Sequence, residues 1–325
     1  MLLENMWFSS LAILIGFTLL VWGADKFVYG ASATASNLGV SPLIIGLTIV
    51  GFGTSAPEIL VSVMAAIDGN PGLAVGNALG SNITNIGLVL GITAIITPLA
   101  VKSNILRREY PLMFIVMLVA LALITDNHLS RLDGIILLVG LVLVMLWMVI
   151  LGMKKNRVDP LEKEFAQEIP HISMGKALFW VLVGLAILLL SSRLLVWGAV
   201  NVARALEISD LVIGLTVVAI GTSLPELAAS VMSAIKKEPD IAIGNVIGSN
   251  IFNLLAVLGV PAIIHPMALD PAVLSRDFVF MIAISIVFFV MAYGIQREGR
   301  INRIEGGLLV CAYGTYMVIL YYSVN

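Results

Sequence analysis

The chain has 325 residues, of which 60% are apolar and 12% are charged, and its formal net charge is −2. A soluble protein carries about twice that share of charged residues, so the composition excludes an ordinary soluble domain and predicts a polytopic protein of the lipid bilayer. The near-neutral charge without a lasting basic run disfavours nucleic acid as a partner, and the single Cys311 excludes an internal disulfide framework.

Apolar segments recur along the chain, separated by charged or Pro/Gly-rich connections. A straight span needs roughly 20 apolar residues, and on that rule we expect ten helices near residues 7–29, 39–67, 72–98, 110–125, 132–152, 176–200, 208–235, 240–265, 277–294 and 304–323. The first is predicted to be a retained span, because residues 1–6 lack the basic residues of a signal peptide. The second and seventh are over-long with central Gly and Pro, which predicts interrupted helices.

The chain divides into two halves of five predicted spans, residues 1–152 and 176–325, joined by a short linker at 153–175. The halves share sequence beyond the motifs described below, as in Leu-Val-Trp-Gly-Ala at residues 20–24 and again at 195–199. Because five is odd, the second half must enter the membrane from the opposite side. An inverted repeat of this kind is typical of secondary transporters, which bind their substrate near the bilayer midplane.

Most Lys and Arg residues fall in connections that share one side of the membrane, including the linker. The positive-inside rule therefore places the linker in the cytoplasm and both termini outside. Asp25, late in the first span, is expected to pair with Lys26 at the membrane interface.

One polar element occurs twice in this apolar sequence. Residues 53–58 read Gly-Thr-Ser-Ala-Pro-Glu and residues 76–85 read Gly-Asn-Ala-Leu-Gly-Ser-Asn-Ile-Thr-Asn; closely similar stretches return 168 positions later, at 221–226 and 244–253. A carboxylate at mid-membrane depth is costly unless it faces a cavity, a partner or an ion. Glu58 and Glu226 are therefore predicted to face a common chamber lined by broken backbone.

A structural alternative for each glutamate is a capping box. Ser55-x-x-Glu58 and Ser223-x-x-Glu226 fit that pattern, with a proline at the first helical position. A cap explains the local sequence but not why a helix should begin at this depth in both halves. We therefore expect a partial cap together with a role as ion ligand.

The chemistry of the repeated element indicates a hard divalent cation. No basic residue lies near either glutamate in sequence, and calcium binds six to eight oxygens from carboxylates, carbonyls and neutral side chains. The elements contain no His or Cys, which disfavours zinc and copper, and magnesium releases its water reluctantly. The available oxygens belong to Glu58 and Glu226, to the hydroxyls of Thr54, Ser55, Ser81, Thr222, Ser223 and Ser249, to the amides of Asn85 and Asn253, and to the main chain near Gly51 and Ala219.

Two uses remain open for the polar residues of the Gly-Ser-Asn stretches. Ser81, Asn85, Ser249 and Asn253 can bind an ion or form hydrogen bonds between helices, since either satisfies a buried polar group. Asn77, Asn82, Asn245 and Asn250 are expected to support the ligands rather than contact the ion. The glycines of the same stretches favour close helix packing.

These duplicated motifs resemble the sodium/calcium exchanger branch of the calcium/cation antiporter superfamily, and its compact bacterial and archaeal members most of all. The resemblance covers the whole chain. It implies an all-α polytopic membrane protein with ten transmembrane helices in two inverted five-helix repeats, the second and third and the seventh and eighth helices being interrupted around a central ion site. It implies as ligands Thr54, Ser55, Glu58, Ser81, Asn85, Thr222, Ser223, Glu226, Ser249 and Asn253, with backbone oxygens of Gly51 and Ala219. Many members carry an aspartate where this chain has Asn85 or Asn253, so it offers two carboxylates rather than three.

The resulting hypothesis is a secondary antiporter, not an enzyme, that exchanges calcium for sodium across the prokaryotic cytoplasmic membrane by alternating access. The family resemblance implies that the first and sixth helices slide to expose the site. A calcium/proton exchanger on the same fold is the alternative, since two buried glutamates can each take up a proton. No cofactor and no protein partner are expected. An intramembrane hydrolase is disfavoured, because no base accompanies Ser55 or Ser223; a passive channel would lack counter-ion dependence.

Overall fold

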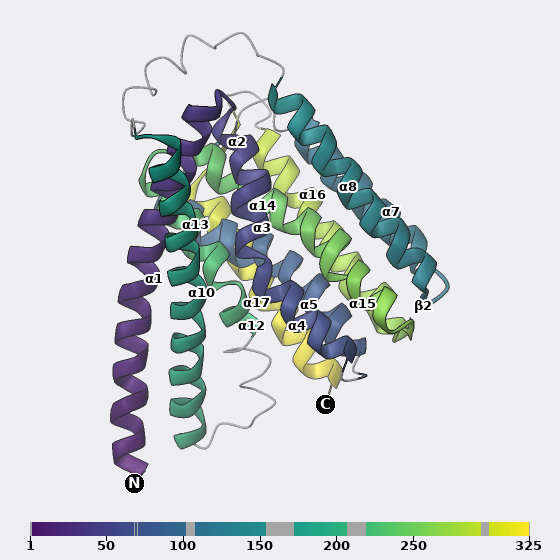
Figure 1. Ribbon diagram of the computed structural model, residues 1–325. Coiled ribbons are helices and arrows are strands. Elements are labelled where there is room, and N and C mark those ends of the chain that lie inside the picture. Colours follow the sequence, from purple (N-terminus) through teal and green to yellow (C-terminus); the bar gives the residue numbers. More distant parts are fainter. Residues whose placement is uncertain are drawn as a thin grey trace.

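The computed structural model describes residues 2–67, 69, 71–101, 108–153, 172–206, 219–293 and 299–324. Within these residues the chain is almost entirely helical (Figure 1). The elements of the first half are α1 (Leu2–Leu38), α2 (Pro42–Ile45), η1 (Gly46–Val50), α3 (Gly51–Thr54), α4 (Ala56–Ile67), α5 (Pro71–Thr84), η2 (Asn85–Leu90), α6 (Gly91–Ile96), β1 (Leu99–Ala100), α7 (Tyr110–Leu123), β2 (His128–Leu129) and α8 (Arg131–Met153). Elements named η are π-helical.

The elements of the second half are α10 (Met174–Ala205), α12 (Ala219–Thr222), α13 (Leu224–Ile235), α14 (Pro239–Phe252), η5 (Asn253–Val257), α15 (Gly259–Ile264), β3 (Met267–Ala268), η6 (Val273–Phe278), α16 (Val279–Tyr293), β4 (Arg300–Ile301) and α17 (Arg303–Val324). Both ends of the chain lie at the same end of the helices, at the bottom of the view in Figure 1.

Among the described residues, seven helices are long and apolar enough to cross a membrane, or eight if the bent pair α2–α3 and α4 is one span. Two further apolar helices, α7 and α13, are shorter. Within the described residues the helix bounds lie within a few residues of the expected ones, except that α1 extends nine residues beyond its expected end at residue 29. The start of the expected seventh span, residues 208–218, lies outside the described residues. Ten spans in an inverted repeat remain a prediction.

One expectation about the third and eighth segments is wrong. We expected them to be interrupted like the second and seventh, but residues 71–96 form one helix, and residues 239–264 continue with only a turn at Leu258. Each of these helices contains a π-helical segment, η2 or η5, at the place where we expected a break. A π-helical turn forms its backbone hydrogen bonds with a wider spacing than an α-helical turn, so the helix can continue through the polar motif without a break.

The helices α1 and α10 form a separate pair at the left of Figure 1. Their backbones approach so closely that a Cβ added at Gly184 would clash with the backbone nitrogen of Phe27. Small residues permit such contacts between membrane helices. Buried side chains of this pair and of neighbouring elements form a hydrophobic cluster distinct from the larger one that fills the rest of the molecule.

Two short antiparallel strand pairs join the halves. Leu99 of β1 pairs with Ile301 of β4, and Leu129 of β2 pairs with Met267 of β3. Each pair thus takes one strand from each half.

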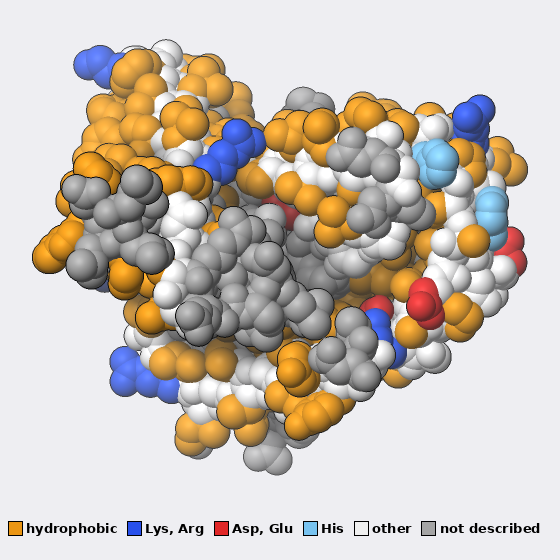
Figure 2. Space-filling model, turned by 90° about the horizontal axis from the view of Figure 1, so that it is seen from below, with side chains coloured by type: hydrophobic (Ala, Val, Ile, Leu, Met, Phe, Trp, Pro, Cys, Tyr) orange, Lys and Arg blue, Asp and Glu red, His pale blue; other side chains and the backbone are white. Residues whose placement is uncertain are grey.

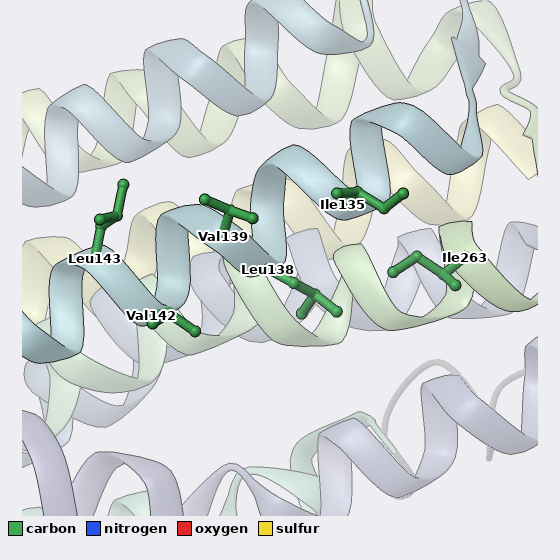
Figure 3. A pocket seen from close by; sticks show the side chains of 6 residues that line it. All are labelled: Ile135, Leu138, Val139, Val142, Leu143 and Ile263. Carbon is green, nitrogen blue, oxygen red and sulfur yellow. The ribbon is translucent and has the colours of Figure 1, made fainter.

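The outer surface is apolar, as a bilayer protein requires. Large hydrophobic side chains such as Trp7, Leu143 and Ile304 are exposed, and the end-on view in Figure 2 is dominated by hydrophobic side chains with few scattered charges. An open groove between α8 and α15 is lined only by aliphatic side chains, among them Leu138 and Ile263 (Figure 3), so it offers no ligand to a cation.

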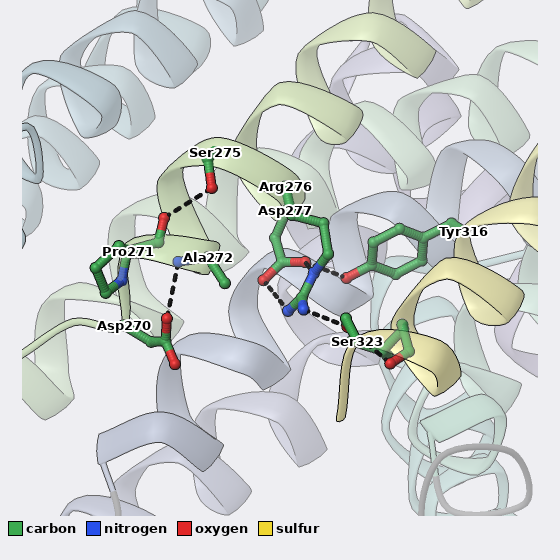
Figure 4. Close-up of polar contacts among 9 residues, drawn as sticks. Asp270, Pro271, Ala272, Ser275, Arg276, Asp277, Tyr316 and Ser323 are labelled. Atoms are coloured by element: carbon green, nitrogen blue, oxygen red, sulfur yellow. Dashed lines mark hydrogen bonds and ion pairs between the residues drawn. The ribbon is translucent and has the colours of Figure 1, made fainter. Parts of the chain in front are cut away.

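Two clusters of charged side chains at helix ends are ion-paired. Arg276 contacts both carboxylate oxygens of Asp277 at 2.7 and 2.9 Å, and the hydroxyl of Tyr316 donates to Asp277 Oδ1, which connects η6 to α17 (Figure 4). The expected pair of Asp25 and Lys26 is confirmed at 3.1 Å. Asp25 has a second partner, Lys236 at the end of α13, at 2.7 Å.

Candidate functional site

The repeated Gly-Thr-Ser-x-Pro-Glu element forms a helix break in both halves. Helix α3 ends at Thr54, and α4 begins at Ala56 after the single residue Ser55, with a bend of 42° between Pro42–Thr54 and Ala56–Ile67. Ser223 separates α12 from α13 in the same way, with φ −90° and ψ 8°. Proline lacks a backbone N–H and cannot continue the preceding helix, so the break follows from Pro57 and Pro225. Each new helix therefore begins with a glutamate in its first turn.

The two glutamates are completely buried, each with 0% of its surface exposed. Both carboxylate oxygens of Glu58, and Oε2 of Glu226, lack a hydrogen-bond partner among the described residues. The other oxygen, Glu226 Oε1, accepts a hydrogen bond from the hydroxyl of Ser55 at 3.3 Å. This contact crosses between the halves, because Ser55 lies three residues before Glu58 in the first half and Glu226 belongs to the second. The structure thus brings together the two acidic groups that the sequence singled out.

The capping-box alternative is not supported. Ser223 forms no capping hydrogen bond, and its hydroxyl has no partner among the described residues. The Ser55 hydroxyl bonds Glu226 across the interface, and the carboxylate of Glu58 bonds no backbone N–H. Both glutamates remain in the first turn of a helix, where the helix dipole favours negative charge.

Two continuous helices complete the walls of the site. Asn77, Ser81 and Asn85 recur every four residues along α5 and into η2, so they lie on one helix face. Asn245, Ser249 and Asn253 repeat this arrangement on α14 and η5. All except Asn77, which is partly buried, are buried.

Further contacts join the two halves around the glutamates. The Thr54 hydroxyl donates to Asn245 Oδ1 at 3.0 Å and lies 3.4 Å from the Ser249 hydroxyl. The Ser249 hydroxyl also donates to the main-chain oxygen of Gly51 at 3.4 Å. Asn85 Nδ2 donates to Asn250 Oδ1 at 3.2 Å. Gly51, Thr54, Ser249 and the Glu226 carboxylate therefore form one contiguous polar region.

The remaining candidate ligands contribute less defined contacts. Ser81 and Ser223 are buried and Thr222 is half-buried. Ala219 begins α12. Neither side-chain polar atom of Asn253, nor Oδ1 of Asn85, has a hydrogen-bond partner among the described residues. Unsatisfied buried oxygens are costly unless something binds them.

Two features of the site were missed in the sequence. The π-helical segments η2 and η5 begin at Asn85 and Asn253, the last polar residues of each motif, and such segments occur often at functional sites. Ser62 and Ser230, one helical turn after the glutamates, also belong to the polar network. The two serines could have been found because they recur at the same offset of 168 positions, but no residue pattern in these stretches predicts the π-helical turns.

This arrangement suits a hard cation. It offers two carboxylates and a set of neutral hydroxyl, amide and main-chain oxygens, and in the described part of the chain no cluster of three or more His, Cys, Asp or Glu residues occurs. Oxygen-only donors of this kind bind calcium or alkali cations rather than zinc or copper.

The chain matches the family model described as sodium/calcium exchanger protein over residues 8–150 and 176–322. The chain belongs to the sodium/calcium exchanger family. It is 49% identical to a putative antiporter, CaxA, of Alkalimonas amylolytica, over 97% of this chain and 99% of the relative. It is 32% identical to the sodium/calcium exchanger MaX1 of Methanosarcina acetivorans, over 97% and 99% of the two chains.

A solved structure of the sodium-calcium exchanger NCX_Mj has the same fold as this protein. The TM-score is 0.82 at 33% sequence identity, covering 96% of this chain and 99% of the other. An inner membrane protein, YrbG of Escherichia coli, is 42% identical over 97% of both chains. The protein is therefore a multi-pass membrane protein and a cation antiporter of the sodium/calcium exchanger family.

Proposed function

We propose that this protein exchanges calcium for sodium across the cytoplasmic membrane by alternating access. The observation that carries the proposal is the pair of fully buried glutamates, supplied by opposite halves, with three carboxylate oxygens that have no hydrogen-bond partner in the part of the chain that the structure describes. Buried charges require compensation, and a bound cation would supply it. One calcium ion would neutralise both groups.

The proposed ligands are the two glutamates and the neutral oxygens around them. The side chains are Thr54, Ser55, Ser81, Asn85, Thr222, Ser223, Ser249 and Asn253, with main-chain oxygens of Gly51 and Ala219. Because the same carboxylates would hold calcium or sodium, the two ions would compete, and this competition would couple their movements.

The decisive experiment uses the full chain reconstituted in sodium-loaded vesicles and diluted into sodium-free buffer containing radioactive calcium. We expect wild-type protein to accumulate calcium, and Glu58→Gln or Glu226→Gln to lower the initial rate at least about 100-fold, because the amide cannot balance the charge of the cation. Glu305→Gln, a change in the first turn of α17, is the matched control and should retain wild-type uptake. Calcium uptake at the wild-type rate by Glu58→Gln or by Glu226→Gln would refute the proposal.

A calcium/proton exchanger is the second candidate, because carboxylate oxygens without a partner can also take up protons. It uses the same residues, so the driving ion must be varied. Calcium uptake driven by a pH gradient in sodium-free vesicles, with no stimulation by a sodium gradient, would favour the proton exchanger.

We also propose that both termini lie outside and that the linker at residues 153–175 is cytoplasmic. The positive-inside distribution of Lys and Arg supports this orientation. In a Cys311→Ser background, Glu164→Cys should react with a membrane-impermeant maleimide only after permeabilisation, whereas Asn325→Cys should react in intact cells. The reverse pattern would overturn the orientation.

A further inference from the structure

Asn245 on α14 connects polar groups that belong to different halves. Its amide nitrogen donates to the main-chain oxygen of Glu226 at 3.1 Å and to the hydroxyl of Ser230 at 2.9 Å. Its oxygen accepts from the Thr54 hydroxyl at 3.0 Å. Asn245 and all three of its partners are buried.

The orientation of this amide is fixed by its surroundings. The Glu226 carbonyl can only accept, so the amide must present its nitrogen to it and its oxygen to Thr54. A flipped amide would set two carbonyl oxygens against each other. The side chain therefore holds α13 at two successive turns, residues 226 and 230, while it offers an acceptor to α3.

The acceptor matters for the Thr54 hydroxyl, which lies in the wall of the chamber. A hydroxyl that binds a cation through its oxygen must direct its hydrogen elsewhere. Asn245 Oδ1 provides a place for that hydrogen, and at 3.0 Å it is closer to the Thr54 hydroxyl than Val50 O at 3.1 Å, Gly51 O at 3.4 Å or the Ser249 hydroxyl at 3.4 Å.

The first half repeats the nitrogen side of this arrangement. Asn77 Nδ2 donates to the main-chain oxygen of Glu58 at 2.9 Å and to the hydroxyl of Ser62 at 2.8 Å. The same two contacts occur at equivalent positions of both halves, which indicates that each half-helix is held in place by an asparagine of the neighbouring helix.

We propose that Asn77 and Asn245 are positioning residues, each holding the half-helix that begins beside a chamber glutamate, and that Asn245 also orients the Thr54 hydroxyl toward a bound cation. This inference rests on the proposed function, since it assigns residues that act through the proposed ligands. Neither asparagine needs to contact the ion.

The test is calcium binding to the purified full chain in lipid nanodiscs, measured by calorimetry in sodium-free buffer. We expect Asn245→Ala to weaken calcium binding about tenfold, as is usual for residues that orient metal ligands. In a Thr54→Ala background the same change should cost less than about threefold, because residues that act through one contact are not additive. A purely structural role predicts the same loss in both backgrounds.

The matched control is Ser285→Ala. Ser285 on α16 is as completely buried as Asn245, but its hydroxyl donates to the main-chain oxygen of Met281 at 2.7 Å, so the calcium affinity of this variant should remain that of wild type. If Asn245→Ala does not fold, Ser230→Ala is the alternative, because it removes only one acceptor of the Asn245 amide. We expect it to weaken calcium binding about threefold.

Each result decides the inference. Wild-type affinity in Asn245→Ala or in a folded Ser230→Ala variant would overturn the positioning role. Equal losses with and without Thr54 would overturn the orientation of the Thr54 hydroxyl by Asn245. Both results leave the exchanger assignment intact. Absence of calcium binding by the wild-type protein would instead overturn the proposed function, and the inference with it.

Discussion

The α1–α10 pair and the helices around the glutamates differ sharply in how they are packed. In the 18-residue apolar stretches of α1 and α10, 28% of the residues are buried. The corresponding share is 72% for the stretch within residues 72–96 and 83% for the stretch within residues 239–264. The pair packs mainly against itself, through glycines such as Gly184. The polar chamber thus lies in the densely packed region, while the pair is an outer unit that contacts the core through a smaller hydrophobic cluster.

This difference gives the two regions different expected roles. A site that binds a small cation needs fixed ligands, which dense packing supplies. A unit that packs on itself can move as a body with little disturbance of the core. The sliding of the first and sixth helices, expected from family resemblance, is compatible with this division and can be tested by perturbing each region separately.

The largest effect is expected in the core, at Gly248. A Cβ here would lie 2.5 Å from the main-chain oxygen of Leu47, so Gly248→Val would force η1 and α14 apart beside Ser249. Overpacking of this kind costs about 1–3 kcal/mol, and we expect calcium binding and exchange both to be lost. Gly140→Val, whose Cβ would meet only the Leu255 side chain at 3.4 Å, is the control. Unchanged calcium affinity in Gly248→Val, measured beside its thermal unfolding, would contradict a fixed site.

A smaller and more selective effect is expected in the pair, at Gly184. Gly184→Val would separate α1 from α10 at Phe27. We expect the rate of exchange to fall about tenfold, because the moving unit is distorted, while calcium affinity changes less than about threefold. Leu190→Val, on the exposed face of α10, should leave both unchanged. Equal loss of affinity in Gly184→Val and Gly248→Val would show that pair and core behave as one unit.

The smallest effect concerns the ion pair between the two regions. The side chains of Asp25 on α1 and Lys236 at the end of α13 are 35% and 27% exposed, so solvent screens their attraction and the pair contributes less than about 1 kcal/mol. Asp25→Asn and Lys236→Met should each lower the melting temperature slightly, and the double variant should be no less stable than the weaker single variant. Fully additive losses in this double-mutant cycle would show that the two side chains are not coupled.

Much of the framework was accessible from the sequence. Pro57 and Pro225, each two residues beyond a Thr-Ser pair, predicted both helix breaks, and the cost of a carboxylate in an apolar segment singled out Glu58 and Glu226. Local sequence could not indicate that Ser55 would donate to Glu226 instead of capping its own helix. That choice depends on how closely the halves approach.

The same limit applies to the supporting residues. Asn245 was expected to support the site, but its partners Thr54 and Glu226 come from different helices. Asp25 gives a similar example. Its ion pair with Lys26 joins neighbours in the sequence, whereas its ion pair with Lys236 forms only because the fold brings α1 and α13 together. Contacts between distant segments depend on helix positions that periodicity does not specify.

The strand pairs β1–β4 and β2–β3 bear on how the chain matures after synthesis. Leu99 meets Ile301, a partner translated about 200 residues later, and such distant contacts close slowly because the intervening chain must first be ordered. We therefore expect the edges of β1 and β2 to stay unpaired until the segments that carry β3 and β4 have been synthesised.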